Sequence, residues 1–387
     1  MTMRYQERQK IIGHLLSQHP GLEQAPEPEV LAAISQAITR LERLRQLDLK
    51  GRHAQVRAVY HTMRGFDILQ EYIDDPEITE IMVNGPQDIF LERAGRLYPA
   101  RERFDNREHL VQVISRAFGR ANRLINEQNP LAGMRLEDGS RVHAVFPPAA
   151  PTGPCLSIRR FTGIRPRLVE LIRQGSLTAE AAHYLEAQVR ARANIFISGG
   201  TGSGKTTFLN ALSGLIPATE RIITIEDAAE LDLQGLPNLV RLEARRPGPD
   251  GQGAITLEDL IKTSLRLRPD RIIVGEVRGA EAFEMIQAMS TGHPGSMSTG
   301  HGNSSREMLD RLSLMILMNS SLPWEAIRRL LASTLDLIIH LERLVDGRRV
   351  VREISEICQF DGRDFVMKAV YLRQAGNELL PQAKEKG

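Results

Sequence analysis

The feature that most constrains the fold is a glycine-rich run at residues 199–206, which fits the pattern G-x-x-x-x-G-K-[ST] in full. An apolar segment, residues 195–197, precedes this run, and a helical pattern follows it. Strand, loop and helix in this order turn backbone N–H groups and a helix N-terminus towards one point, where phosphate oxygens bind. We expect Lys205 to reach the β- and γ-phosphates of ATP and the Thr206 hydroxyl to ligate Mg²⁺. The predicted binding residues are Gly199, Gly200, Thr201, Gly202, Ser203, Gly204, Lys205, Thr206 and Thr207.

Two acidic segments follow apolar strands, as hydrolysis beside a phosphate loop requires. The stretch RIIVGE ends in Glu276, which we expect to serve the Mg²⁺ side or to orient water. The stretch RIITIEDAAEL carries Glu226, Asp227 and Glu230, and carboxylates gathered in this way usually hold a cation or transfer a proton. The spacing leaves open which glutamate polarises the attacking water, and an acidic surface turn is the alternative.

Two histidines, His293 and His301, lie in the small-residue stretch TGHPGSMSTGH. Glycine-rich backbone lets a side chain approach a ligand closely, so both imidazoles are candidate hydrogen-bonding partners of the γ-phosphate. The alternative for each histidine is an ordinary structural or solvated position. The pair is included in the expected nucleotide site.

Changes in composition and in hydrophobic pattern predict four parts along the chain. The first part is charged and without strand signals, and Ile34, Ile38, Leu41 and Leu44 recur there at helical spacing. Four prolines and a glycine between residues 147 and 154 mark a loop in the second part. The expected parts are a helical region at 1–62, an α+β domain at 63–165, a linker at 166–180 and an ATPase domain at 181–387.

The apolar patterns predict different sheets in the two larger parts. In the α+β domain we expect strands at 78–85, 88–97, 141–148 and 155–161, and a helix at 107–124. From residue 181 onward strands and helices alternate, which predicts an α/β domain with a mostly parallel sheet and helices on both faces. Its expected strands are 194–199, 221–226, 238–244, 271–276 and 296–300, and its helices are one after the loop and others at 256–267, 279–290 and 305–335.

Composition excludes several classes of protein. The formal net charge is only +2 and aromatic residues make up 5%, so neither a global positive field nor a stacking surface favours nucleic acid. The two cysteines, Cys155 and Cys358, are far apart, and they suggest no disulfide framework or zinc site, which suits a reducing cytoplasm. Because no apolar run approaches the ~18–20 residues that span a bilayer, any work at a membrane should depend on docking.

Taken together, the motifs resemble those of the secretion ATPases of bacterial type II and type IV secretion and of type IV pili. The run GGTGSGKTT is similar to their Walker A motif, ITIEDAAEL to their aspartate box, RPDRIIVGEVRG to their Walker B motif and TGHPGSMSTGH to their histidine box. The segments EIMVNG, DGSRVHAVFPP and LSIRRF look most like the CpaF branch, the assembly ATPases of tight-adherence (Flp) pili. The resemblance covers roughly residues 65–360.

The resemblance implies a fold, an assembly and residue roles. In the family a PAS-like N-terminal domain is linked to a RecA-like domain, and six subunits form a ring with ATP between domains and subunits. Glu230, the last acid of the aspartate box, would be the general base, with Glu226 as alternative or helper and Glu276 on the Mg²⁺ side. The family's N-terminal domain supplies arginines to the phosphates, and Arg159 and Arg160 match that position. Further arginine candidates are Arg135, Arg141, Arg266 and Arg278.

The function that the resemblance implies is Mg²⁺-dependent ATP hydrolysis by a cytoplasmic homo-hexamer. This motor, peripheral at the inner face of the cytoplasmic membrane, would drive pilus assembly or secretion of the Flp type through an inner-membrane platform protein. A type IV or type II secretion ATPase is the alternative. A nucleic-acid motor would need a basic stripe with aromatic residues, which the sequence lacks. The intact Lys205, Glu230 and Glu276 argue against a nucleotide-dependent scaffold that does not hydrolyse ATP.

Overall fold

The structure, a computed structural model, describes residues 3–40, 48–160, 166–233, 235–245, 247, 252–374 and 379–382. Its internal contacts divide the chain into two compact units, Met1–Gly163 and Ile164–Gly387. Leu41 and Leu44, which the spacing predicts on a helix, lie outside the described residues, as does Phe161 at the end of one expected strand.

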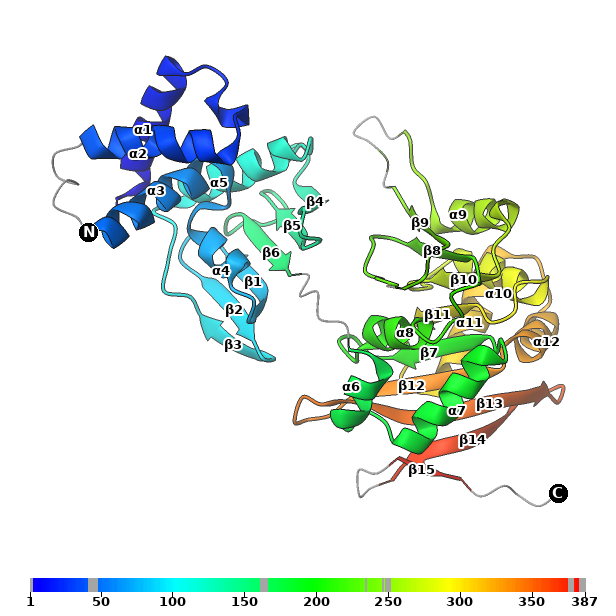
Figure 1. The fold of residues 1–387 in the computed structure, drawn as a ribbon. Coiled ribbons are helices and arrows are strands. Elements are labelled where there is room, and N and C mark those ends of the chain that lie inside the picture. Colours follow the sequence, from blue (N-terminus) through cyan, green and yellow to red (C-terminus); the bar gives the residue numbers. More distant parts are fainter. Residues whose placement is uncertain are drawn as a thin grey trace. The chain divides into compact units, whose positions relative to one another are not determined.

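The N-terminal helices of the first unit form because apolar residues recur on one face of each helix. On α2 the side chains of Val30, Ile34 and Ile38 are at most 1% exposed, and they share one core with Val59 and Met63 of α3. The helices predicted for this region are therefore present. They are α1 (Tyr5–Gln18), the short 3-10 helix η1 (Leu22–Gln24), α2 (Glu27–Arg40) and α3 (Leu49–Arg64) (Figure 1).

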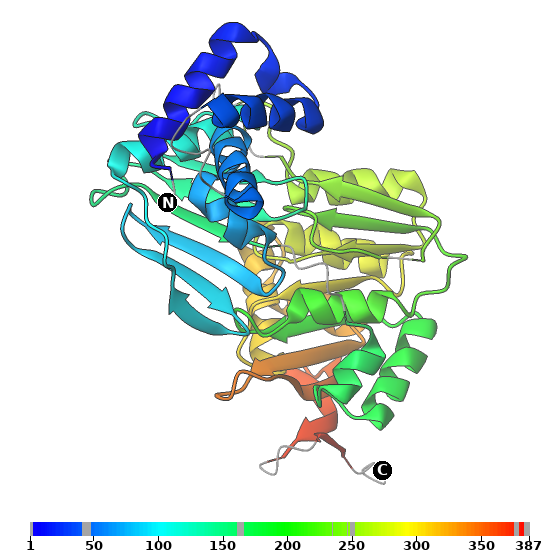
Figure 2. The same cartoon turned by 60° about the vertical axis from the view of Figure 1, so that its left-hand side comes forward.

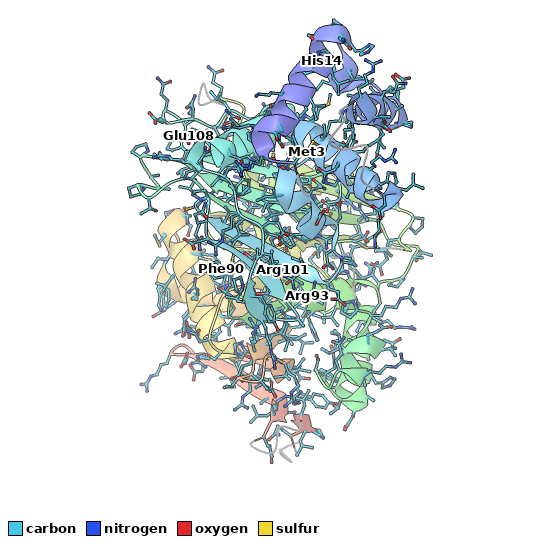
Figure 3. All side chains as sticks on the ribbon, turned by 90° about the vertical axis from the view of Figure 1, so that its left-hand side faces the viewer. Met3, His14, Phe90, Arg93, Arg101 and Glu108 are labelled. Atoms are coloured by element: carbon cyan, nitrogen blue, oxygen red, sulfur yellow. The ribbon has the colours of Figure 1, made fainter. Side chains whose placement is uncertain are left out.

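A six-stranded antiparallel sheet in the order β3-β2-β1-β6-β5-β4 forms the rest of the first unit. Leu110 and Ile114 of α5 pack with Ile81 and Val83 of β1, so the helix covers one face of the sheet. A turn at 94–95 divides the predicted strand 88–97 into β2 and β3, and the structure adds β4, an edge strand whose residues alternate between exposed and half-buried. Figure 3 labels Phe90, a residue of β2, on this sheet. The elements are η3 (Asp67–Leu69), α4 (Gln70–Asp74), β1 (Ile78–Asn84), β2 (Ile89–Arg93), β3 (Arg96–Pro99), α5 (Arg107–Arg120), β4 (Leu131–Arg135), β5 (Arg141–Val145) and β6 (Cys155–Arg159).

Asp67 joins the N-terminal helices to the antiparallel sheet domain. Its carboxylate, 5% exposed, accepts hydrogen bonds from Arg8 of α1 at 2.8 Å and from Thr62 of α3 at 3.1 Å. The His109 ring of α5 accepts a backbone N–H at Nδ1, so its Nε2 carries the proton that it shares with Asp67 at 2.8 Å. Tyr5 of α1 stacks on the His109 ring with 3.6 Å between the ring centroids. Buried charges are stable only when paired in this way, so helices and sheet share one polar junction.

The second unit is built on a nine-stranded mixed sheet in the order β15-β14-β13-β12-β7-β11-β10-β8-β9. The strands from β12 to β9 in this order are parallel, as predicted, whereas β13, β14 and β15 extend the sheet with antiparallel pairs. The elements are α6 (Leu168–Arg173), α7 (Ala179–Arg190), β7 (Ile195–Gly199), α8 (Lys205–Ser213), β8 (Ile222–Glu226), β9 (Leu239–Glu243), α9 (Leu257–Ser264), η4 (Leu265–Leu267), β10 (Arg271–Val274), α10 (Glu281–Ser290), β11 (Met297–Gly300), α11 (Ser305–Asn319), α12 (Trp324–Thr334), β12 (Leu337–Arg343), β13 (Arg349–Phe360), β14 (Phe365–Arg373) and β15 (Leu379–Pro381).

Helices cover both faces of this sheet, because its central strands are apolar on both sides. Along β7, Ile195 and Ile197 pack into a core with α7 and α8, whereas Phe196 packs into a second core with α10, α11 and α12 (Figures 1 and 2). All residues of β7, β8, β10 and β11 are buried. The α/β architecture predicted for this part of the chain is thus present as a mixed sheet.

The parallel strands end at one edge of the sheet, where ligands bind in open α/β folds. β7 leads into the glycine-rich loop, β8 into the acidic turn after Glu226, β10 into Glu276 and β11 into His301. The range 166–180, expected as a linker, contains α6 and the start of α7. The division of the chain into four parts remains a prediction.

Candidate nucleotide site

The phosphate loop joins the end of β7 to the start of α8. Gly202 and Gly204 have φ of 72° and 93°, and Gly204 is the N-cap residue of α8. A Cβ on Gly199 would lie 2.5 Å from Ser203 Oγ and 2.7 Å from the Leu341 carbonyl oxygen. The backbone therefore needs glycine at these positions, both for the left-handed conformation and for the close approach of β12.

Lys205 lies at the first position of α8 and is 8% exposed. Its Nζ donates to the carbonyl oxygens of Gly199 and Gly200, both at 3.1 Å, and lies 3.3 Å from His301 Nδ1. Burial lowers the pKa of Lys205, and the nearby Glu276 carboxylate opposes that shift. The ammonium is thus held at the mouth of the loop. Of the other loop residues, Thr201 and Thr207 are exposed and Thr206 is half-buried.

The acidic turn after β8 is held in shape by two carboxylates. Glu226, 4% exposed, accepts the backbone N–H groups of Glu230 at 2.8 Å and Leu231 at 2.9 Å through the same oxygen, Oε1. Glu243 of β9 accepts the backbone N–H of Ala229 at 2.8 Å. Burial raises the pKa of Glu226. The Glu230 carboxylate acts electrostatically on Lys205, so the turn brings Glu230 towards the loop.

Glu276 and His301, from neighbouring strand ends, meet beside Lys205. Glu276 Oε1 lies 2.8 Å from His301 Nε2, and Glu276 Oε2 accepts a hydrogen bond from Arg278. Arg278 also lies 3.5 Å from Asp227 of the acidic turn. Burial, reinforced by the Lys205 charge, lowers the pKa of His301. The imidazole is therefore favoured in its neutral form between the lysine and the carboxylate.

Two buried oxygen atoms at this edge of the sheet have no hydrogen-bond partner in the described chain, as expected of atoms that contact a bound ligand. Within the described residues, Glu276 Oε1 and Ser203 Oγ are buried without a hydrogen-bond partner, because the contact of Glu276 with His301 does not have hydrogen-bond geometry. Across the described part of the chain, no group of three or more His, Cys, Asp or Glu side chains is arranged to hold a metal ion. Mg²⁺ is usually bound through one or two protein oxygens, phosphates and water. Thr206 and Glu276 fit that role together with a bound nucleotide.

The structure does not bring His293 to this edge of the sheet. His293 precedes β11 and lies 3.2 Å, through Nδ1, from the carbonyl oxygen of Ala288 on α10, whereas His301 follows β11. The four residues of β11 run the length of the parallel sheet between them. The eight-residue spacing therefore spans one strand and separates the two rings, rather than pairing them at one ligand.

Arg159 and Arg160 belong to the first unit and differ in their contacts. Arg160 donates to the backbone carbonyl of Asp75, and to that of Ile78 at 3.3 Å. Arg159 is exposed at the end of β6. Strand pairing places Arg135, Arg141 and Arg159 opposite one another on β4, β5 and β6, and Glu80 of β1 lies opposite Arg159, so three arginines and one glutamate occupy one cross-strand row. Arg266 is exposed on η4 of the second unit.

Sequence reasoning missed the contribution of the C-terminal hairpin to the loop. Arg349 of β13 donates through Nε to the Gly202 carbonyl at 2.9 Å, and Arg343 of β12 lies beside the same glycine. A cleft of about 650 Å³ adjoins this contact, and its lining includes Ser203, His340 and Arg343. The Asp-Gly turn at 346–347 signals a hairpin, but nothing local shows that the hairpin reaches the loop.

A phosphate loop at the end of a central parallel strand, faced by a lysine and by carboxylates from neighbouring strands, defines the P-loop class of nucleotide-hydrolysing enzymes. Comparison with known proteins narrows this class. The chain belongs to the type II/IV secretion system protein family, whose model matches residues 62–381. It is thus a secretion-family ATPase, which confirms the prediction made from its motifs.

Individual relatives are similar over most of the chain. The putative conjugal transfer protein Rv3659c of Mycobacterium tuberculosis (strain ATCC 25618 / H37Rv) is 34% identical over 316 residues, covering 80% of this chain and 89% of that protein. The type IV secretion system protein VirB11 of Brucella suis biovar 1 (strain 1330) is 36% identical over 318 residues, covering 75% of this chain and 87% of that protein.

Solved structures share the fold. The structure of the pilus retraction motor PilT with bound ADP matches with a TM-score of 0.54 and 21% identity, covering 82% of this chain and 83% of that chain. At this identity the likeness concerns architecture alone. N-terminal helices, an antiparallel sheet domain and a mixed sheet are features of this chain. Within the described residues, no helix is both long and apolar enough to cross a membrane.

Proposed function

We propose that the protein is an ATP-hydrolysing motor of a type IV secretion or conjugation machine. The observation that carries the proposal is the gathering of Lys205, Glu230 and Glu276 at one edge of the parallel sheet. The names of the relatives, a type IV secretion protein and a putative conjugal transfer protein, favour this assignment over a tight-adherence pilus. The CpaF-type pilus motor, supported by the resemblance of EIMVNG and LSIRRF, is the second candidate.

The proposed ligands are ATP and Mg²⁺. When bound, Mg²⁺ neutralises charge that develops on the phosphate oxygens. Lys205 would bind the β- and γ-phosphate oxygens, and Thr206 with Glu276 would hold the Mg²⁺ side. His301 would donate or accept a hydrogen bond next to the γ-phosphate. These roles combine a positioned cation with acceptors that are already fixed by the strand ends.

Glu230 would act as the general base, and Glu226 would position it. Glu226 is buried and its Oε1 is already engaged by two backbone N–H groups, one of them that of Glu230. A carboxylate used in this way fixes the turn on which the base lies, whereas Glu230 carries its own carboxylate towards Lys205. A base must be within hydrogen-bond reach of the attacking water, and a fixed turn limits how far Glu230 can drift.

Six copies are proposed to form a ring in which the PAS-like antiparallel domain of the first unit supplies arginines to a site on the RecA-like second unit. The observation that supports this is the exposed side chain of Arg159 at the end of β6. Arginines that act on a transferring phosphoryl group accelerate related reactions by about 10³–10⁵-fold. Arg160, whose guanidinium binds backbone carbonyls, is the weaker donor of the two.

The proposed place of work is the cytoplasmic face of the inner membrane, where the ring would push on a membrane platform protein. The finding that no described helix can cross a membrane is compatible with such peripheral attachment. Direct action on nucleic acid is not part of the proposal. Turnover should therefore be the same with and without added DNA or RNA, and clear stimulation by either would favour a nucleic-acid motor.

The deciding experiment is complementation between two inactive variants of the full chain. We expect ATP hydrolysis in Mg²⁺ to rise faster than linearly with protein concentration, and Glu230→Gln and Arg159→Ala each to abolish it. Arg93→Ala is the matched control, because Arg93 pairs with Asp75 on the surface of the same sheet. Mixing the two inactive variants should restore activity if the arginine acts on a neighbouring subunit. No recovery would contradict the shared site, and ATP binding without turnover at any concentration would contradict the motor.

A further inference from the structure

A hairpin near the C-terminus carries the mixed sheet past the phosphate loop. β12 pairs in parallel with β7 so that Leu341 lies opposite Gly199, and β12 continues two residues further to Arg343. Arg349, the first residue of β13, pairs with Arg343. At about 3.3 Å per residue, both arginines extend beyond the end of β7 and stand beside the loop.

Arg349 contacts the loop at two points. Its Nε donates to the carbonyl oxygen of Gly202 at 2.9 Å. Its aliphatic stem covers Gly204, where a Cβ would lie 3.1 Å from Arg349 Cδ. Both glycines have positive φ, so the Arg349 side chain contacts the two loop residues whose backbone is left-handed.

The first contact fixes the direction of a loop N–H group. In a trans peptide the carbonyl and the N–H point in opposite directions, so holding the Gly202 oxygen orients the N–H of Ser203. That N–H makes only a long bond of 3.4 Å to the Gly200 carbonyl oxygen. It is therefore available to a phosphate oxygen, as the N–H groups of such loops generally are.

The backbone of Arg349 is anchored in turn to the start of the second unit. Ser176, which lies between α6 and α7, donates through Oγ to the Arg349 carbonyl at 2.7 Å. The Ser176 carbonyl accepts from the backbone N–H of Val351 at 2.8 Å and from Arg373 at 2.9 Å. Ser176 and Arg373 are 7% and 4% exposed. A buried network thus joins residues 175–176 to the strand that carries Arg349.

We propose that Arg349 is a positioning residue for the phosphate loop and that it ties the loop to residues 175–176. The proposal rests on the ATPase activity of the family, but not on the type of secretion machine. A loop whose N–H groups are already oriented loses less freedom when it binds phosphate. The effect should therefore fall on the binding of ATP and ADP, and not on the chemical step.

The test compares Arg349→Ala, Arg349→Lys and Arg348→Ala in the full chain. Arg348 pairs with Asp346 in the same hairpin and is the matched control. Arg349→Ala should raise KM for ATP and Kd for ADP about three- to tenfold, with kcat within about twofold, because one hydrogen bond from a charged donor is lost. Lysine, which can still donate to Gly202, should restore part of the loss. A rise no larger than that of the control, or a fall in kcat with KM unchanged, would overturn the proposal.

The tether is tested by a double-mutant cycle. Ser176→Ala alone should give a smaller rise in Kd for ADP, and should add almost nothing in the Arg349→Ala background, because both act on one path. If the effects of Ser176→Ala and Arg349→Ala on Kd were fully additive, the proposed link between the loop and residues 175–176 would be wrong. Thermal midpoints of all variants show whether a loss of fold explains the result. Since ADP binding is measured directly by calorimetry, a wild type that binds ADP but does not hydrolyse ATP would count against the motor and leave this test intact.

Discussion

Replacing Glu226 by glutamine separates two roles that the motif alone leaves open. Its Oε1 accepts two backbone N–H groups and its side chain is buried. Glutamine has the same shape, and its amide oxygen can accept both hydrogen bonds. If Glu226 only fixes the turn, Glu226→Gln should keep kcat within about threefold, whereas Glu230→Gln should lose about 10²–10⁴-fold as expected for removal of a general base.

The magnitude of the stability change follows from the same two bonds. Glu226→Ala leaves the buried N–H of Leu231 and the part-buried N–H of Glu230 without this acceptor, and because a buried unpaired group costs about 1–3 kcal/mol, the free energy of unfolding should fall by at least that amount. Burial raises the pKa of Glu226, so the ionised carboxylate costs stability as pH rises from the unfolded value of about 4.3 through the higher folded value. Above that window, Glu226→Gln should be neutral or stabilising.

The assay is urea unfolding of the full chain at pH 5 and pH 8, with steady-state ATP hydrolysis on the same preparations. The glutamine variant should gain stability relative to wild type on going from pH 5 to pH 8. The alanine variant should be destabilised at both. A stable Glu226→Gln protein that is as inactive as Glu230→Gln would refute the reasoning, because the carboxylate itself would then be needed for the reaction.

Three further outcomes are expected. Arg271→Met should lower the free energy of unfolding by up to about 3–5 kcal/mol, because Arg271 is 0% exposed and Glu220, which it binds at 2.6 Å, would keep only the longer contact with Arg192 at 3.5 Å; urea unfolding measures this. Burial alone would raise the pKa of Asp67, but the His109 hydrogen bond and the Arg8 charge hold it below the ordinary value. Its stability contribution should therefore be complete at pH 7 and be lost below about pH 4, so thermal midpoints of Asp67→Asn and wild type should converge in acid. Gly199→Ala should abolish ADP binding in calorimetry, because the new Cβ would displace the loop.

A surface ion pair provides the control for the buried one. Arg190→Ala removes a pair with Glu186 whose arginine side chain is 68% exposed, and such pairs contribute about 0–1 kcal/mol. An Arg271→Met variant no less stable than Arg190→Ala would contradict the account of the buried pair. A constant midpoint difference for Asp67→Asn across pH, or normal ADP binding by Gly199→Ala, would contradict the other two.

The sequence predicted the parts of the site that depend on local order. The loop at 199–206 needs only a strand before it and a helix after it, and parallel strands bring their ends to one edge, so Glu276 and His301 follow from the same logic. The position of His293 could not be predicted in this way, because an eight-residue spacing does not show at which end of a short strand each residue lies. The antiparallel strands β13 to β15 also went beyond the predicted parallel sheet.

Contacts that depend on register could not be predicted from local patterns. Arg349 reaches Gly202 because Leu341 pairs with Gly199 across two strands that are far apart in the chain. A shift of register by one residue would turn the side chains of β12 to the other face. The same holds for the row formed by Arg135, Arg141 and Arg159, which exists only because three separate strands align.

Asp67 has a consequence for how the first unit comes apart. Its carboxylate is the meeting point of three segments, since Arg8, Thr62 and His109 belong to α1, α3 and α5. Departure of α1 or of α5 would take one of its two strongest partners from a buried carboxylate, so local opening of the N-terminal helices and opening of the sheet are coupled in free energy. The helices and the sheet domain should accordingly form a single cooperative unit in hydrogen exchange. A change that destabilises α1 should therefore also lower the protection of α5.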